Sequence, residues 1–172
     1  AKNFGYPVFN ADYEVTKLYK KDKKIFKKLK KKLPKYISSF PINKNEITKA
    51  ILSNKVNLHK IISIVHLEIR KLLKLFLIKN RNKKIIILDI PLLLENKINN
   101  KNDILVFVDS KNIEIEKRLK KRLNLNRKLM NMFKKIQFSS SYKKKKSNFI
   151  IKNNFNKKSL NKSIKKILNE IL

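Results

Sequence analysis

One stretch of the sequence is most informative about the fold: Ile85-Ile-Ile-Leu-Asp-Ile-Pro-Leu-Leu-Leu-Glu-Asn96. An apolar run rich in β-branched residues that ends at an acid and a proline is typical of a strand buried on both faces of a parallel sheet. A second such run covers 104–109. Because parallel sheets covered by helices bind ligands at the carboxyl ends of their strands, Asp89, Glu95 and Asp109 stand where a site is expected.

The rest of the chain alternates strand patterns with helical patterns. Two further short strands are expected at 7–12 and 148–153. Apolar residues recur at helical spacing in five segments, 13–32, 45–52, 58–76, 113–123 and 160–171. Two of these helical segments have no strand between them, which indicates a helical lobe within an α/β frame. The order predicts an α/β domain over 1–172 with a parallel sheet flanked by helices.

Composition bounds the class of protein. A hydrophobic content of 42% over 172 residues is enough for a core. The chain has no Cys, which excludes a disulfide framework and a thiolate metal site. There is no apolar run of about 18 residues, as a membrane span would need, and the amino end lacks the apolar segment of a signal peptide. We therefore expect a cytoplasmic protein, without a membrane span and monomeric.

The formal net charge of +33 indicates attraction to nucleic acid, because neutralising phosphates releases counterions. The lysines are spread through every segment, however, and Lys, Asn and Ile are residues whose codons can consist of A and T alone. Most of the charge is therefore interpreted as solvated surface. A basic nucleic-acid-binding α/β protein remains the alternative function, and it predicts lysines gathered on one surface with exposed aromatic residues.

Phosphate-handling α/β folds normally open with a strand and a Gly-rich loop, and this chain contains neither. It has no Gly-x-x-x-x-Gly-Lys-Ser/Thr, and Gly5 is its only glycine. The chain also begins with Ala1 and not with Met. We expect an in-frame Gly-rich loop in the coding sequence upstream.

Several motifs occur in a fixed order along the chain. They are Phe4-Gly-Tyr-Pro-Val-Phe-Asn-Ala-Asp12, Ile47-Thr-Lys-Ala-Ile-Leu52, His66-Leu67 with Arg70, Asp89-Ile-Pro-Leu-Leu-Leu-Glu95, the pair Arg118 and Arg122, and Ile150-Ile-Lys-Asn153. Together they resemble dephospho-CoA kinase, the last enzyme of coenzyme A synthesis, over nearly the whole chain. The match of 89–95 to the family's Asp-x-Pro-Leu-Leu-Phe-Glu is the most specific.

The resemblance implies a P-loop-kinase-like parallel sheet, with a helical substrate lobe at about 13–80 and a lid at about 124–147. It implies that the first, central strand is missing, which predicts a gap of about 9 to 10 Å between the strands at 85–90 and 104–109. It also implies ATP-dependent phosphorylation of the 3′-hydroxyl of dephospho-CoA, with Mg²⁺. Without the Gly-rich loop, the chain as given is expected to be inactive, and a catalytically dead remnant is a third reading.

The family comparison also implies roles for two catalytic residues. Asp12 would act on the ribose 3′-hydroxyl, although a carboxylate there could instead cap a helix that begins at Tyr13. Arg118 would contact ATP phosphates together with Arg122, which lies on the same helical face, although such pairs are more often simply solvated. We predict that Asp12, Arg118 and Glu95 face a common cleft.

Further residues are assigned to the two substrates through the same resemblance. The acceptor would be bound by His66, Arg70, Pro91, Leu92, Leu93 and Glu95. Asn153 would lie near the adenine of ATP. His66 could instead be a satisfied core or lobe histidine, and Glu95 could merely end the leucine run at the surface. No cluster of His, Cys or Asp has metal-ligand spacing, so the only metal expected is the Mg²⁺ that accompanies ATP.

Four positions depart from the family pattern. The first Asp of Asp-Ala-Asp is Asn10, the Pro after the lobe His is Leu67, the lid Arg is Ser140, and the usual Asp before Asn153 is Lys152. The effect of these changes on activity is left open by the sequence.

Overall fold

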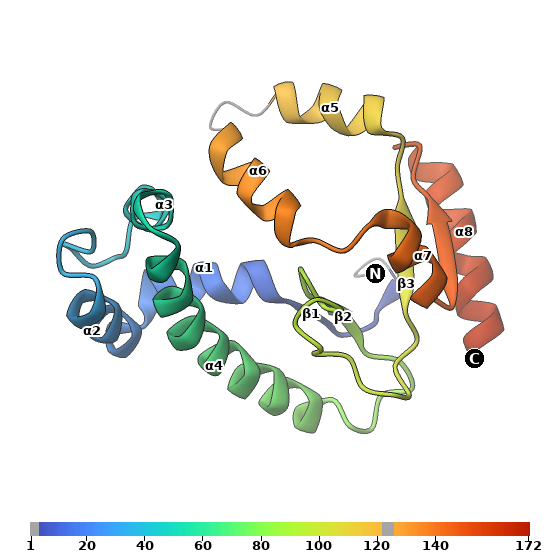
Figure 1. The fold of residues 1–172 in the computed structure, drawn as a ribbon. Helices are drawn as coiled ribbons and strands as arrows, with labels where there is room; N and C mark the ends of the chain where they lie inside the picture. The colour runs from blue at the N-terminus through green and yellow to red at the C-terminus, as the bar shows by residue number, and fades with distance from the viewer. Residues whose placement is uncertain (1–3, 122–125) are drawn as a thin grey trace. The chain divides into compact units, whose positions relative to one another are not determined.

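The computed structural model describes residues 4–121 and 126–172 (Figure 1). The chain forms two compact units, Ala1–Pro91 and Leu92–Leu172, and each is described by itself. Within the described residues, no helix has the combined length and apolar character needed to cross a membrane. The prediction of one domain over 1–172 stays a prediction.

The first unit pairs two short strands around a run of helices. Its elements are β1 (Val8–Asn10), α1 (Ala11–Lys21), α2 (Lys23–Lys32), α3 (Lys44–Ser53), α4 (Lys55–Lys79) and β2 (Ile87–Asp89). The two strands are parallel, with Phe9 opposite Leu88 and Asn10 opposite Asp89. The carboxyl ends of both strands therefore lie side by side.

A single helix expected at 13–32 is instead two helices that meet at Asp22. The Asp22 N–H still donates to the Leu18 carbonyl at 3.0 Å, which closes α1. The Asp22 carboxylate accepts the backbone N–H groups of Lys24 and Ile25 at 2.8 and 3.0 Å, which opens α2. Because an aspartate satisfies these otherwise free donors, it ends one helix and begins the next.

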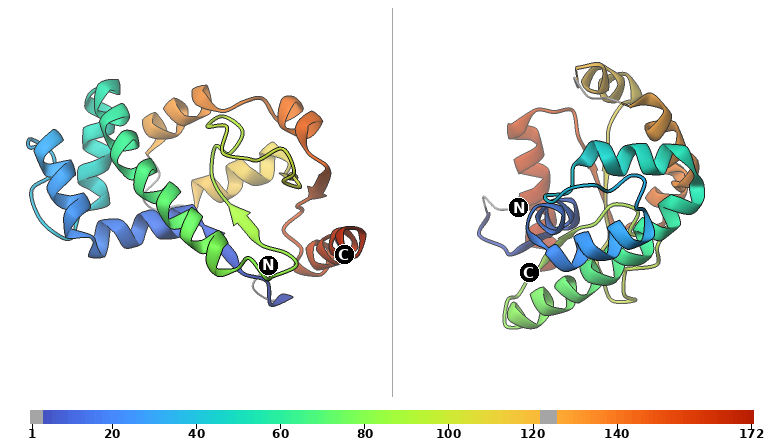
Figure 2. Two further views of the ribbon diagram at one scale, coloured as in Figure 1. Left: turned by 90° about the horizontal axis from the view of Figure 1, so that it is seen from below. Right: turned by 90° about the vertical axis from the view of Figure 1, so that its left-hand side faces the viewer.

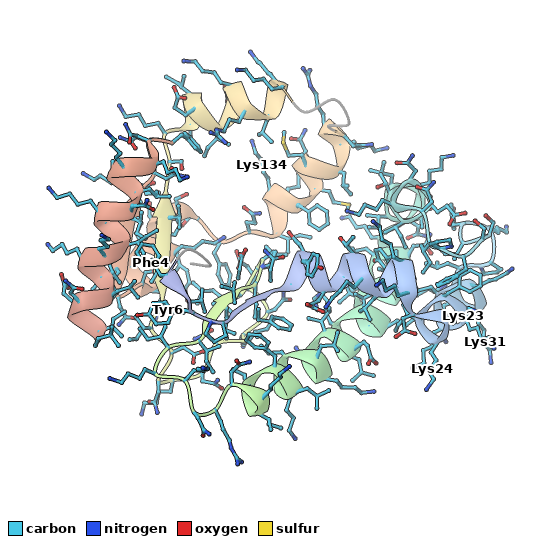
Figure 3. The ribbon with its side chains drawn as sticks, turned by 180° about the vertical axis from the view of Figure 1, so that it is seen from behind. Phe4, Tyr6, Lys23, Lys24, Lys31 and Lys134 are labelled. Carbon is cyan, nitrogen blue, oxygen red and sulfur yellow. The ribbon has the colours of Figure 1, made fainter. Side chains whose placement is uncertain are left out.

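The core of the first unit lies between its helices. Along α4 the buried apolar residues are Leu58, Ile61, Val65 and Ile69, which confirms the apolar face expected there. Ile25 and Leu29 of α2 are almost fully buried, whereas the lysines Lys23, Lys24 and Lys31 point away from the unit (Figure 3). Figure 2 shows α4 crossing the other helices of this lobe. The lysines of α2 thus form a solvated face, as interpreted from the sequence.

The second unit likewise has two strands with a run of helices between them, and one further helix follows the second strand. Its elements are β3 (Val106–Asp109), α5 (Asn112–Lys120), α6 (Arg127–Ile136), α7 (Ser140–Lys146), β4 (Phe149–Lys152) and α8 (Lys157–Ile171). The strands β3 and β4 are parallel, with Asp109 opposite Lys152. The helix α8 lies alongside β4 (Figure 1), and Ile151 of β4 is buried.

The expected α/β class with parallel strands and flanking helices is confirmed. The strands are shorter than expected, however, and the prediction of complete burial is wrong. Val106 and Val108 of β3 are 42% and 54% exposed, and the residues of β2 are half-buried or exposed. Within the described residues each sheet has two strands, and α8 contacts β4, whereas these two valines of β3 remain exposed.

Candidate functional site

The carboxyl ends of β1 and β2 are joined by a side-chain hydrogen bond. Asn10 Nδ2 donates to Asp89 Oδ2 at 2.7 Å, and Asn10 Oδ1 accepts the N–H of Tyr13 at 2.8 Å. Both ends of the Asn10 amide are therefore used. An aspartate at this position would place a second negative charge against Asp89, so asparagine removes a repulsion between carboxylates.

Asp12 lies in the first turn of α1, and its side chain is exposed. The interpretation that Asp12 caps a helix beginning at Tyr13 is wrong, because α1 begins at Ala11 and Asn10 is its cap. A carboxylate in the first turn is favoured by the positive end of the helix dipole. Asp12 is thus available to solvent close to the end of β1, and its catalytic role stays a prediction.

A tight turn follows Pro91 at the end of β2. Leu92 has φ 56 and Lys97 has φ 49, both in the left-handed region. The carbonyl of Leu92 accepts the N–H of Asn96 at 3.0 Å, and the carbonyl of Leu93 accepts the N–H of Ile98 at 3.1 Å. A non-glycine residue in this conformation costs roughly 1 to 2 kcal/mol, and such strain is common in functional loops.

Glu95 in this loop is held by two donors from later in the chain. Glu95 Oε1 accepts the N–H of Phe138 at 2.9 Å and contacts Lys143 Nζ at 2.8 Å. Only 6% of its side chain is exposed, so the reading that Glu95 merely ends the leucine run at the surface is wrong. Burial by itself would raise the pKa of Glu95, but the hydrogen bonds from Lys143 and from backbone N–H groups outweigh it and lower that pKa.

A second ion pair attaches α7 to the end of β3. Lys144 Nζ lies 2.7 Å from Asp109 Oδ2 and 5.9 Å from the centroid of the Phe107 ring. Adjacent lysines of α7 therefore contact two carboxylates, Glu95 and Asp109. Ser140, which stands where the family pattern has an arginine, is the first residue of α7.

Arg118 of α5 contacts the turn that follows β4. Its guanidinium carbon lies 3.8 Å from the centroid of the Phe155 ring, a close cation–π contact. Phe155 has φ 61, and its N–H donates to Asn153 Oδ1 at 2.9 Å. The N–H of Asn153 donates in turn to the carbonyl of Asp109 at 2.7 Å.

These contacts bring together two of the residues assigned to ATP, Arg118 and Asn153, while the third, Arg122, lies outside the described residues. No sequence motif pointed to Phe155. An aromatic residue among asparagines between a strand and a helix was the available signal for it.

His66 and Arg70 lie one turn apart on α4. His66 is half-buried, and Arg70 is exposed. Burial lowers the pKa of His66 below its ordinary value, and the positive charge of Arg70 lowers it further. His66 is therefore neutral at pH 7, and a polar ring stands beside a permanent cation on one helix face. Its half-burial on α4 is compatible with the alternative of a lobe histidine, and its role in substrate binding stays a prediction.

The described residues contain no group of three or more His, Cys, Asp or Glu that could hold a metal ion. A Mg²⁺ ion commonly takes one or two protein carboxylates and fills its other positions with phosphates and water. Asp12 and Asp89 are carboxylates at strand ends of the first unit, which suits that mode of binding. The predicted common cleft of Asp12, Glu95 and Arg118, and the predicted gap between strands, stay predictions.

Comparisons with known proteins agree on one family. The family model described as dephospho-CoA kinase matches residues 1–159. The dephospho-CoA kinase of Wolbachia pipientis wMel is 31% identical over 172 residues, which is 99% of this chain and 88% of the relative.

Solved structures show a similar fold. The crystal structure of TT1252 from Thermus thermophilus covers 99% of this chain and 87% of its own, with a TM-score of 0.77 and 21% identity. Dephospho-CoA kinase from Campylobacter jejuni gives a TM-score of 0.65 and 20% identity over the same shares of the two chains. At these identities the structures support the fold alone.

Proposed function

The chain belongs to the dephospho-CoA kinase family, and we propose that it serves the ATP-dependent phosphorylation of the 3′-hydroxyl of dephospho-CoA, the final step of coenzyme A synthesis. The observation that carries this proposal is the position of the matched motifs. The motifs at 4–12, 89–95 and 150–153 each include the carboxyl end of a strand, the edge at which such sheets bind ligands. The alternative of a nucleic-acid-binding protein has no support from the comparisons.

Asp12 is proposed to orient the acceptor hydroxyl and take up its proton. Phosphoryl transfer depends mainly on positioning and on stabilising charge at the migrating group. The first turn of α1 fixes the backbone of Asp12 beside the end of β1, and its exposed carboxylate is free to meet a substrate. The hydrogen bond between Asn10 and Asp89 holds the two strand ends in register beneath it.

ATP is proposed to bind at the turn after β4. Arg118 would contact the phosphates through its planar guanidinium, which suits bidentate contacts. Stacking on Phe155 fixes the plane of that guanidinium while leaving its N–H edges free to donate. Asn153, which shapes the turn, would lie near the adenine. Arg122, which lies outside the described residues, would add a second cation.

Residues of α4 and residues of the loop after β2 are each proposed to contact dephospho-CoA. Arg70 offers an exposed cation for the substrate's phosphates, and neutral His66 offers a hydrogen bond beside it. Pro91, Leu92 and Leu93 would supply apolar contacts, with Glu95 closing the loop. Mg²⁺ would be held largely by the ATP phosphates and would neutralise their charge. We also propose a cytoplasmic, monomeric protein with a lid formed by about 124–147 and a helical substrate lobe at about 13–80.

The test uses two polypeptides. The 172-residue chain is expected to form no ADP in the presence of ATP, Mg²⁺ and dephospho-CoA, because it has no Gly-rich loop. The same chain joined to the amino-terminal strand and Gly-rich loop of a family member is expected to produce coenzyme A. A folded but inactive chimera would support the reading of a catalytically dead remnant, and turnover by the 172-residue chain would refute the need for that loop.

Two variants of the chimera test the role of Asp12. Asp12→Asn is expected to lower kcat by about 10²-fold or more, because the acceptor hydroxyl loses its base. Glu14→Gln is the matched control, since Glu14 lies on the same helical turn and pairs with Lys17 at 2.6 Å. Equal effects of the two substitutions would refute a catalytic role for Asp12.

A further inference from the structure

Glu95 connects two segments that are far apart in sequence. It lies in the loop 92–98, whereas Phe138 lies between α6 and α7 and Lys143 lies within α7. One oxygen, Glu95 Oε1, receives both the Phe138 N–H and the Lys143 ammonium group. The carboxylate therefore holds the connection between α6 and α7 in place.

The burial of this pair sets it apart from the other ion pairs of the unit. The side chains of Glu95 and Lys143 are 6% and 22% exposed, whereas those of Asp109 and Lys144 are 31% and 39% exposed. The pair Glu114 and Lys117 is more exposed still, at 41% and 66%, and so is the pair Glu170 and Lys166, at 49% and 81%. Solvent and salt screen an exposed pair strongly and a buried pair much less, so the Glu95 contact is the strongest restraint of these four described ion pairs.

A buried carboxylate is costly unless donors compensate for its lost hydration. Here an ammonium group and a backbone N–H both compensate, so the carboxylate is stable only while α7 and the α6–α7 connection stay in place. Removing either donor would leave a buried charge with only one of its two partners, and this cost opposes any displacement of this segment.

We propose that Glu95 is a positioning residue, whose buried carboxylate pins the connection between α6 and α7 to the loop that follows β2. The pinning itself follows from the contacts of Glu95, and only its consequence for catalysis rests on the proposed function. If that loop contacts dephospho-CoA and the segment 127–146 covers the ATP phosphates, Glu95 links the acceptor side of the site to its lid. Its side chain then acts through Phe138 and Lys143 and does not bind the substrate itself.

The first test is amide hydrogen exchange in the 172-residue chain without ligands. Glu95→Gln and Lys143→Met are expected to speed exchange of the Phe138 amide by about 10²-fold, the scale expected for breaking a buried pair. Lys143→Arg keeps the cation and should stay within about threefold of the wild type. Glu114→Gln is the exposed control and should have no effect. Unchanged exchange in both Glu95→Gln and Lys143→Met would overturn the proposal.

The second test is a pH titration of the wild-type chain, which does not depend on a variant that folds. Lys143 is the charged group that faces Glu95, and the other donors are backbone N–H groups. The Phe138 amide resonance should shift as pH falls through the pKa of Glu95, which lies below its ordinary value of 4.5. Lys143→Met should move this midpoint to higher pH. An amide that does not titrate with Glu95 would overturn the contact.

Binding of dephospho-CoA, measured by calorimetry, separates positioning from direct contact. Glu95→Gln and Lys143→Met should change the affinity by the same factor, within about threefold of each other, because a positioning residue acts only through the contact that both variants break. A loss at least about tenfold larger in Glu95→Gln than in Lys143→Met would show direct substrate binding and overturn the proposal. If the wild-type chain does not bind dephospho-CoA, the proposed function fails, and the exchange and titration results still decide the role of Glu95.

Discussion

Asn10 and Asp89 stand opposite each other at the carboxyl ends of two parallel strands and share a hydrogen bond of 2.7 Å. A related arrangement occurs in the second unit, where Lys152 stands opposite Asp109 at the end of β4. Both Asn10 and Lys152 replace an aspartate of the family pattern. Each replacement faces an acid in register, so each removes a potential repulsion between two carboxylates.

Asn10→Asp is predicted to lower the free energy of unfolding by about 0.2 to 1 kcal/mol at pH 7, because it replaces a donor with a second carboxylate beside the exposed Asp89. Repulsion raises the pKa of this carboxyl pair in the folded state. The loss should therefore be present above that raised pKa and disappear as pH falls below the unfolded value. Urea denaturation at several pH values measures this.

The matched double variant provides the control for this prediction. Asp89→Asn in the Asn10→Asp background restores one carboxylate and one amide, so stability should return at pH 7. A double variant as unstable as Asn10→Asp would show that charge repulsion is not the cause.

Arg70→Met is predicted to raise the pKa of His66 while leaving it below 6.5, because burial, the larger cause of the shift, remains. A lowered histidine pKa means that the unfolded state binds the proton more readily. Stability linked to His66 is therefore lost as pH falls through the unfolded value, and the loss levels off below the folded pKa. An NMR titration of the imidazole C–H groups measures the pKa directly.

Lys71→Met is the control for the His66 prediction, since it removes a neighbouring cation that pairs with Glu68 at 3.5 Å. Its effect on the pKa of His66 should be smaller than that of Arg70→Met. Equal shifts would show that the general charge of the helix, and not Arg70, acts on His66.

Phe155→Gly and Phe155→Ala are predicted to differ in stability. Both remove the ring that Arg118 stacks on, but glycine also relieves the left-handed backbone at φ 61. Phe155→Gly should therefore be more stable than Phe155→Ala by roughly 1 kcal/mol. Chemical denaturation tests this order, and the reverse order would mean that the turn holds no backbone strain.

Asp22→Ala is predicted to lower the free energy of unfolding by about 1 kcal/mol, with a range of roughly 0.5 to 2, because the first N–H groups of α2 lose their acceptor. Asp22→Asn keeps an oxygen in the same place and should lose much less. Thermal or urea unfolding followed by circular dichroism distinguishes them. A loss in Asp22→Asn as large as that in Asp22→Ala would point to charge and not to capping.

Local pattern and motif order were sufficient to predict the element types and the family. The apolar spacing along α4 and the acid at the end of β2 are properties of neighbouring residues, so they can be read without the fold. Asp22 was missed because the helical periodicity continues through it, and only the hydrogen bonds of its carboxylate reveal the break. The partners of Glu95 lie more than 40 residues away, and no local pattern encodes such a contact.

The distribution of buried side chains gives the two units different physical dependences. Among the described residues, the buried apolar side chains lie in the first unit, with Ile151 as the exception. The burial of apolar side chains therefore stabilises the first unit, and the stability of this unit responds chiefly to urea and temperature. The second unit has few buried apolar side chains among its described residues, and dissolved salt weakens its exposed charge pairs, such as Lys144 and Asp109. The stability of this unit, which carries Arg118 and α6, should therefore depend on the ionic strength of the solution, because its sequence is rich in lysine.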